Sequence, residues 1–294
     1  MEKIYFNYED DIINPCWDNV FKAIFTRDTP ESHGALEYLL SAILKRDLSV
    51  QSMMTNEPPV DNINERQIRY DITCKFGNGE LCNIEMSLNP DLYEPVRSEY
   101  YSGKLFTSQD IRGKNKSYSD LKHTYQIALL VNEPIYEDNI FVHNFMYYDE
   151  EHGVSLNGRT HIITIELSKL EQTAQKSASD MTALERWAVF FRYTVDKDKR
   201  KLVNEIIKIE EGIAMAGQVL LSISKDERER ARLLSEYKFA VDIQSKMVDA
   251  ERGGGDKRAI EIARKLLKRN RPMNEIIEDT GLTLDQIEEL RFSN

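Results

Sequence analysis

The chain has 294 residues, of which 41% are hydrophobic and 30% charged, and its formal net charge is −11. This composition is typical of a soluble globular protein with one large or two modest domains. It argues against a protein that coats nucleic acid non-specifically, because phosphate binding rests on clustered Lys and Arg. No apolar run approaches the ~20 residues of a membrane span, and the first residues do not resemble a signal peptide. We therefore expect a cytoplasmic protein with no membrane partner.

The first elements that the pattern predicts are two helices and a strand. Residues 17–25 carry apolar side chains at helical spacing, and Asp18 and Lys22 lie four residues apart on the polar side of that helix. Residues 36–44 continue as a second helix. Residues 50–56 then form the first strand, which two consecutive prolines end.

Two alternating runs around Gly77-Asn78-Gly79 predict a β-hairpin. In residues 70–76 and again in residues 80–88, apolar side chains alternate with polar ones. A three-residue turn pairs Cys74 with Cys82, whereas a two-residue turn would set apolar residues opposite polar ones. The three cysteines of the chain do not form a disulfide framework, so we expect these two as buried free thiols.

The same register places Asp71 directly opposite Glu85 on the polar face of the hairpin. Directly opposed side chains have Cβ atoms ~5 Å apart, and two carboxylates at that separation repel each other. A divalent cation between them removes the repulsion and uses both as ligands. The spacing leaves one alternative open, in which both carboxylates face water and share nothing.

A helix over residues 95–110 follows the hairpin. Arg97, Tyr101, Lys104 and Ser108 recur there at spacings of three and four, which gives one polar face with a basic character. Such a face binds phosphate locally, although a solvated helix face has the same pattern.

The remaining strands come next along the chain. After a loop over residues 112–119, residues 125–131 form a nearly continuous apolar strand, which suits a sheet covered on both faces. Two alternating runs, residues 140–147 and 161–166, extend the sheet.

From about residue 180 the chain changes to long, highly charged helices. Apolar residues at helical spacing mark residues 184–191 and 202–213, and Ser224 caps a further helix that carries Leu233, Tyr237 and Val241.

Gly253-Gly254-Gly255 is the clearest flexible break in the sequence. Beyond it, residues 256–270 form a basic helix, and residues 272–280 and 283–290 form two short ones. Thr283 and Gln286 make a capping box for the last helix. We expect three parts, over residues 1–175, 176–252 and 253–294.

Several of these motifs together resemble one enzyme superfamily. Asp71 and Glu85-Met86-Ser87 fall where the PD-(D/E)XK nucleases have an Asp on one strand and Glu-x-Lys or Glu-x-Gln on the next. Residues 14–25 resemble its opening helix with an Asp and a Phe-Lys. Residues 97–122 and 253–290 resemble later parts of one member family, the recombination-promoting nucleases and putative transposases of bacteria.

The resemblance implies an α/β fold: a restriction-endonuclease-like PD-(D/E)XK core, with a mixed central sheet flanked by helices, followed by an all-helical C-terminal region. It implies a metal-dependent DNA endonuclease associated with transposition or recombination. The implied metal is Mg²⁺ or Mn²⁺, and its ligands are Asp71, Glu85, the main-chain carbonyl of Met86 and, as a further carboxylate, Asp18.

One position departs from the family pattern, because Ser87 stands where a Lys or Gln is usual. A lysine there would orient the attacking water and stabilise negative charge on the phosphate, whereas a serine supplies no positive charge. Lys75 and Lys104 are the candidates to replace it, and Ser87 itself can hold a water. Lys22, Arg97 and Lys104 are the expected DNA contacts.

Two other function classes remain open at this stage. A chain that keeps the fold but has weakened or lost catalysis would be a DNA- or protein-interaction protein derived from a mobile element. The last helices also resemble a helix-turn-helix, which would make a transcription regulator. Residues 283–290 carry three acids and no base, so we expect them to contact protein, either the preceding helices or a second copy of the chain, more than DNA.

Overall fold

The computed structural model describes residues 5–54, 69–111, 115–156, 158–268, 271–284 and 287–288. The end of the predicted first strand, part of the predicted loop over 112–119, and most of the predicted last helix with its capping box lie outside these residues. The chain divides into two compact units, residues 1–233 and residues 234–294. The candidate site lies in the first.

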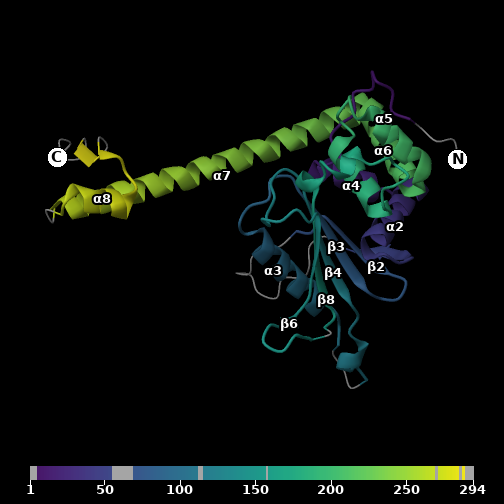
Figure 1. Cartoon of the computed structure of the whole chain (residues 1–294), viewed down its shortest axis with the longest axis horizontal. Helices are drawn as coiled ribbons and strands as arrows, with labels where there is room; N and C mark the ends of the chain where they lie inside the picture. Colours follow the sequence, from purple (N-terminus) through teal and green to yellow (C-terminus); the bar gives the residue numbers. More distant parts are fainter. Residues whose placement is uncertain are drawn as a thin grey trace. The chain divides into compact units, whose positions relative to one another are not determined.

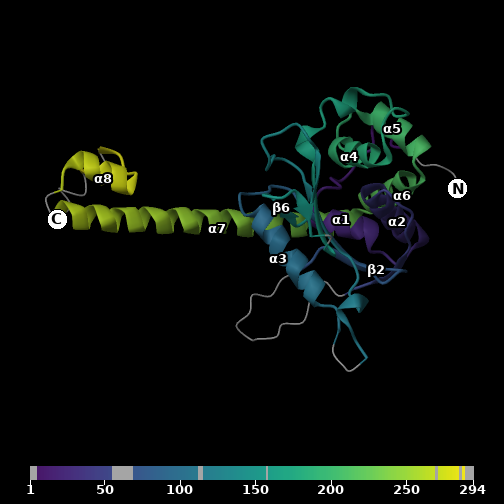
Figure 2. The same cartoon turned by 60° about the horizontal axis from the view of Figure 1, so that its bottom comes forward.

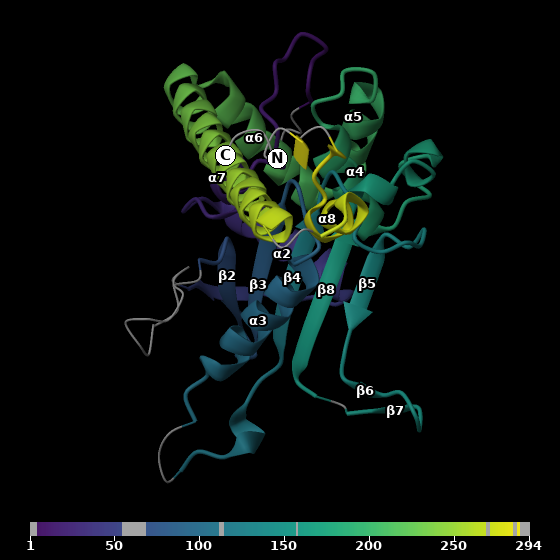
Figure 3. The ribbon, with the colours of Figure 1, turned by 90° about the vertical axis from the view of Figure 1, so that its left-hand side faces the viewer.

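The first unit is built on one mixed sheet of six strands (Figure 3). The outer pairs are antiparallel, whereas β3, β4 and β8 run parallel to one another. In spatial order the strands are β1 (Val50–Met53), β2 (Ile72–Phe76), β3 (Leu81–Ser87), β4 (Thr124–Leu130), β8 (Thr160–Glu166) and β5 (Val142–Phe145). A separate two-stranded hairpin, β6 (Tyr148–Asp149) and β7 (Val154–Ser155), follows β5.

The hairpin register predicted from the alternating pattern is confirmed. Cys74 pairs with Cys82 and Ile72 pairs with Ile84. The amide of Phe76 donates to the carbonyl of Glu80 at 2.9 Å, which closes the three-residue turn. Both cysteines are buried free thiols. The register is fixed because one face of each strand carries the apolar side chains that the core requires.

Helices cover both faces of the sheet. α3 (Glu94–Thr107) packs on β3, β4 and β8, and it lies in front of the strands in Figure 3. On the opposite face, the end of α2 (Pro30–Leu44) and the side chains of β4, β5 and β8 line a common pocket. The strands between these layers are therefore buried on both sides, as the apolar run of β4 predicts.

The other helices of this unit pack together beside the sheet (Figures 1 and 2). Their core is aromatic: the ring centroids of Phe21 and Phe191 lie 5.8 Å apart, and those of Phe25 and Trp187 lie 6.0 Å apart. These helices are α1 (Asp18–Phe25), α4 (Ala183–Tyr193), α5 (Arg200–Ile209) and α6 (Glu211–Lys225), and short 3-10 turns occur at Tyr118–Asp120, Leu167–Lys169 and Thr173–Gln175.

Two helix predictions need correction. The run over residues 202–213 is not one helix, because the backbone at Glu210 is extended and separates α5 from α6. Ser224 is not the cap of the next helix: its hydroxyl donates to the carbonyl of Leu220 inside α6. Asp226 takes the capping role, since its carboxylate accepts from the amides of Arg228 and Glu229.

The C-terminal part contains α7 (Glu227–Lys268) and α8 (Met273–Thr280). The backbone stays helical through Gly253, Gly254 and Gly255, where the sequence predicts a break. The second unit has a small core of its own, formed by Ala263, Ile276, Leu282 and Ile287. The expected fold class, a mixed sheet flanked by helices with a helical C-terminal region, is confirmed.

Candidate active site

Asp71 and Glu85 meet at one end of the β2–β3 hairpin. The amide of Asp71 donates to Oε1 of Glu85 at 3.1 Å, and the amide of Met86 donates to Oδ2 of Asp71 at 2.9 Å. Each carboxylate therefore accepts from the backbone of the strand that carries the other. Asp71 is 8% exposed, so the two groups share a small, nearly dry space.

Burial dominates the electrostatics of this pair. It raises the pKa of Asp71 to about 6, and the nearby charge of Asp18 adds to the effect. It also raises the pKa of Glu85 well above its usual range, with Asp71 as the next cause. Two desolvated carboxylates that repel each other favour a bound cation. This donor set, all oxygen and acidic, suits a hard divalent ion such as Mg²⁺ or Mn²⁺.

The helix α1 brings two further charged groups to Asp71. Nζ of Lys22 lies 2.9 Å from Oδ1 of Asp71 and 2.9 Å from Oδ1 of Asp18. Burial would lower the pKa of Lys22, but the carboxylates of Asp71 and Asp18 outweigh that effect and raise it. We call Asp18, Lys22, Asp71 and Glu85 the carboxylate site.

Buried amides hold Glu85 in place. Nδ2 of Asn83 donates to Oε1 of Glu85 at 2.7 Å and to Oε1 of Gln126 at 2.8 Å. The hydroxyl of Thr73 donates to Oδ1 of Asn83 at 3.3 Å. Because all three supporting side chains are almost fully buried, the network fixes the orientation of the Glu85 carboxylate.

Ser87 lies two residues beyond Glu85, on the same face of β3, and contacts α3. Its hydroxyl donates to Oε2 of Glu94 at 3.1 Å and accepts from Nη2 of Arg97 at 3.3 Å. Glu94 and Arg97 also form a direct ion pair. Burial raises the pKa of Glu94, and the positive charge of Arg97 counters only part of this shift.

The two lysines expected to replace the residue at position 87 lie on different elements, β2 and α3. Lys75 is exposed and pairs with Leu81 beside the hairpin turn. It is four residues from Asp71, roughly 13 Å along the strand. Lys104 lies in α3 with its ammonium 5.9 Å from the centroid of the Tyr100 ring.

The structure brings three further residues to this site that were not predicted from the sequence: Asn83, Gln126 and Glu94. Asn83 carried a usable signal, because the period of two in β3 puts it on the face of Glu85. Gln126 did too, as the polar residue inside an apolar strand. Glu94 carried none, since its contact depends on how α3 lies on the sheet.

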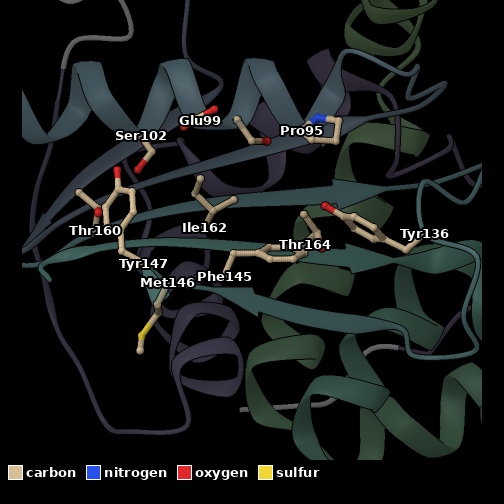
Figure 4. Close-up of a pocket in the computed structure, with 11 residues that line it drawn as sticks. Pro95, Glu99, Ser102, Tyr136, Phe145, Met146, Tyr147, Thr160, Ile162 and Thr164 are labelled. Atoms are coloured by element: carbon tan, nitrogen blue, oxygen red, sulfur yellow. The ribbon is translucent and has the colours of Figure 1, made fainter. Parts of the chain in front are cut away.

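A cavity of about 350 Å³ lies between α3 and the strands β8 and β5 (Figure 4). Pro95, Ser98, Glu99 and Ser102 line it from the helix. Strand β8 contributes Thr160, Ile162 and Thr164, and Phe145, Met146 and Tyr147 come from β5 and the residues after it. Neither carboxylate of the β2–β3 hairpin lines this cavity.

The described residues include a second acidic group with metal-ligand chemistry. Single ligand atoms of Asp138, His143 and Glu166 lie within 4.8 Å of one another. Nζ of Lys169 lies 2.9 Å from Asp138 and 2.5 Å from Glu166. A positive charge of the chain itself therefore compensates this group, as Lys22 does at the carboxylate site.

Comparison with known proteins agrees with this geometry. Residues 15–250 match the family described as PD-(D/E)XK nuclease family transposase, which covers Asp18, Asp71, Glu85 and the β2–β3 hairpin. No curated protein matches the chain. No solved structure matches it either. In the described residues, no helix is both long and apolar enough to pass through a membrane. The match spans most of the chain, and the chain therefore belongs to the PD-(D/E)XK nuclease family transposases.

Proposed function

We propose that the protein is a metal-dependent DNA endonuclease that hydrolyses phosphodiester bonds at the carboxylate site. The observation that carries this proposal is the convergence of Asp71, which is buried, and Glu85, which is half-buried, with raised pKa values for both carboxylates. Family membership supports DNA as the substrate and a divalent metal as the cofactor.

Different residues of the site would bind the cation and orient its ligands. Asp71 and Glu85 would hold the cation, with the Met86 carbonyl and Asp18 as further oxygen ligands. When bound, Mg²⁺ or Mn²⁺ lowers the pKa of a coordinated water and stabilises negative charge on the phosphate. Asn83 keeps the Glu85 carboxylate aimed at the shared space, so the ligands need little rearrangement.

Positively charged side chains near these carboxylates would bind the DNA backbone. Lys22 reaches Asp71 from α1, and Arg97 and Lys104 lie along α3. The net charge of −11 makes this binding local, because most of the surface repels phosphate.

The test is nicking of supercoiled plasmid with Mg²⁺ or Mn²⁺ by the wild type and by Asp71→Asn. We expect Asp71→Asn to lose at least ~100-fold in cleavage rate, because it removes a ligand charge. Asp198→Asn, an exposed aspartate after α4, is the matched control and should cleave as the wild type does. Equal rates for Asp71→Asn and the wild type would refute the proposal.

One observation favours a second candidate, a DNA- or protein-interaction protein that no longer cleaves. The ammonium of Lys22 already lies between Asp18 and Asp71, so a metal ion competes with a charge of the chain. Under this alternative the wild type binds DNA, yet neither Mg²⁺ nor Mn²⁺ produces nicks at any concentration. Calorimetric titration with Mn²⁺ separates the endonuclease from the interaction protein. In the endonuclease, Asp71→Asn removes the heat of Mn²⁺ binding, whereas in the interaction protein the wild type and Asp71→Asn give the same signal.

A further inference from the structure

The neighbourhood of Ser87 contains a positive charge that the side chain at position 87 cannot supply. Nη2 of Arg97 lies 3.3 Å from the Ser87 hydroxyl. A serine ends one bond beyond its Cβ, whereas a lysine carries its ammonium four bonds beyond. Measured from Cβ of Ser87 through its hydroxyl and across the 3.3 Å contact, the path to Nη2 of Arg97 is about as long as a lysine side chain beyond its Cβ. The guanidinium therefore lies within reach of a lysine ammonium at position 87.

We propose that Arg97 is a catalytic residue: its guanidinium stabilises the negative charge that develops on the phosphate beside Glu85. This inference rests on the proposed endonuclease function and deepens it. In the hydrolytic step a water oxygen forms a bond to phosphorus while the bond to the leaving sugar oxygen breaks. Protons pass to and from solvent water. Arg97 stays charged throughout and donates only hydrogen bonds, because an arginine does not deprotonate in proteins.

Glu94 acts as the positioning residue for Arg97. Glu94 is 2% exposed, and its Oε2 accepts hydrogen bonds from both the Ser87 hydroxyl and the Arg97 guanidinium. Because Glu94 begins α3 and Arg97 lies one turn later, the helix backbone fixes the pair. A buried carboxylate at this place selects one orientation of the long arginine side chain.

The ion pair leaves Arg97 able to bind phosphate. Arg97 contacts Ser87 and Glu94 through Nη2, and its side chain is 47% exposed. A guanidinium has five donors in a planar fork, which matches the geometry of phosphate oxygens. The exposed part of the guanidinium can therefore donate hydrogen bonds to a phosphate group.

Lys22 does not duplicate this role. It lies on the Asp71 side of the carboxylate site and is held between two carboxylates. Arg97 contacts Ser87, which lies two residues beyond Glu85 on the same face of β3. The two cations therefore act on different parts of a bound phosphate group.

Single-turnover cleavage of a labelled duplex, with the protein and Mg²⁺ saturating, tests the inference. We expect Arg97→Ala to slow cleavage by about 100-fold, the usual effect of removing one donor to a developing oxyanion. Adding Ser87→Lys to Arg97→Ala should recover at least about tenfold, because the lysine ammonium enters the same space. Arg228→Ala, an exposed arginine of α7, is the matched control and should cleave at the wild-type rate.

Arg97→Ala leaves the buried Glu94 carboxylate without its partner, so the protein could lose stability. The double variant Glu94→Gln and Arg97→Gln removes both charges, so it leaves no buried carboxylate without a partner. We expect it to fold and to cleave as slowly as Arg97→Ala. Thermal unfolding of each variant identifies any that do not fold.

Three outcomes would overturn the inference while leaving the nuclease intact. The first is a wild-type rate at saturation with only weaker DNA binding, which makes Arg97 a simple phosphate contact. The second is no rescue by Ser87→Lys in a folded protein, and the third is full activity of the double variant. Failure of the wild type itself to cleave would instead remove the proposed function and this inference together.

Discussion

At the scale of single residues, the geometry of the carboxylate site depends on buried side chains that hold Glu85 in place. Asn83 is fully buried in β3, and its one amide group donates to both Glu85 and Gln126. Thr73 completes the chain of hydrogen bonds from the neighbouring strand. A catalytic carboxylate is useful only when its oxygens point in one direction, and this network provides that orientation.

We expect Asn83→Ala to lower the free energy of unfolding by about 1–3 kcal/mol, because it removes the amide that donates to the buried Oε1 of Gln126 and one of the two donors to Oε1 of Glu85. Mn²⁺ affinity should fall as well, since Glu85 loses its orientation. Urea denaturation measures the first effect and calorimetric titration the second. Asn144→Ala, in the edge strand β5, is the control. A variant with wild-type metal affinity would show that Asn83 does not position Glu85.

At the scale of elements, the β2–β3 hairpin sets the site because its turn sets the register. Gly79 has φ of +86°, the left-handed region that a three-residue hairpin turn requires at that position. A different turn would shift β3 by one residue. Glu85 would then point to the apolar face, away from Asp71.

Gly79→Ala should therefore lower the free energy of unfolding by about 1–2 kcal/mol, the cost of a Cβ in the left-handed region. Gly103→Ala in α3 should change the free energy of unfolding in the opposite direction. Among the described residues, no atom beyond the neighbouring helix backbone lies within 4 Å of an added Cβ there, and the helix favours alanine. We expect this second variant to gain about 0.5–1 kcal/mol. Urea denaturation of both proteins checks the pair, and equal stabilities would contradict this account of the turn.

At the scale of the whole molecule, the chain joins the unit that carries the site to a helical unit with its own core. The start of α7 belongs to the first unit, where the Asn19 side chain donates a hydrogen bond to the carbonyl of Leu233. The second unit contains a basic stretch before Pro272 and acidic residues after it. Residues 283–290 carry three acids, which phosphates would repel.

Truncation after Glu251 should leave the thermal stability of the first unit unchanged, because the contacts within residues 1–233 remain. We expect the truncated protein to change its oligomeric state, measured by sedimentation, while its DNA affinity changes little. The measurement of affinity uses one duplex at several salt concentrations. Loss of sequence-specific DNA binding with an unchanged oligomeric state would instead revive the helix-turn-helix interpretation.

Much of the core was predictable because local periodicity and burial are linked. In a strand, alternate side chains face opposite sides, so the pattern around the hairpin turn was sufficient for the pairing of Cys74 with Cys82. The same register brought Asp71 next to Glu85. The apolar run of β4 likewise predicted a strand covered on both faces.

Contacts between distant elements were decided only by the tertiary structure. Lys22 reaches Asp71 from a helix far away in the sequence, and Glu94 and Arg97 meet Ser87 because α3 lies across the sheet. The triple glycine is helical although its residues favour a break. Periodicity determines which side of an element is buried, whereas the packing of one element on another determines which side chains meet, and no local pattern encodes that packing.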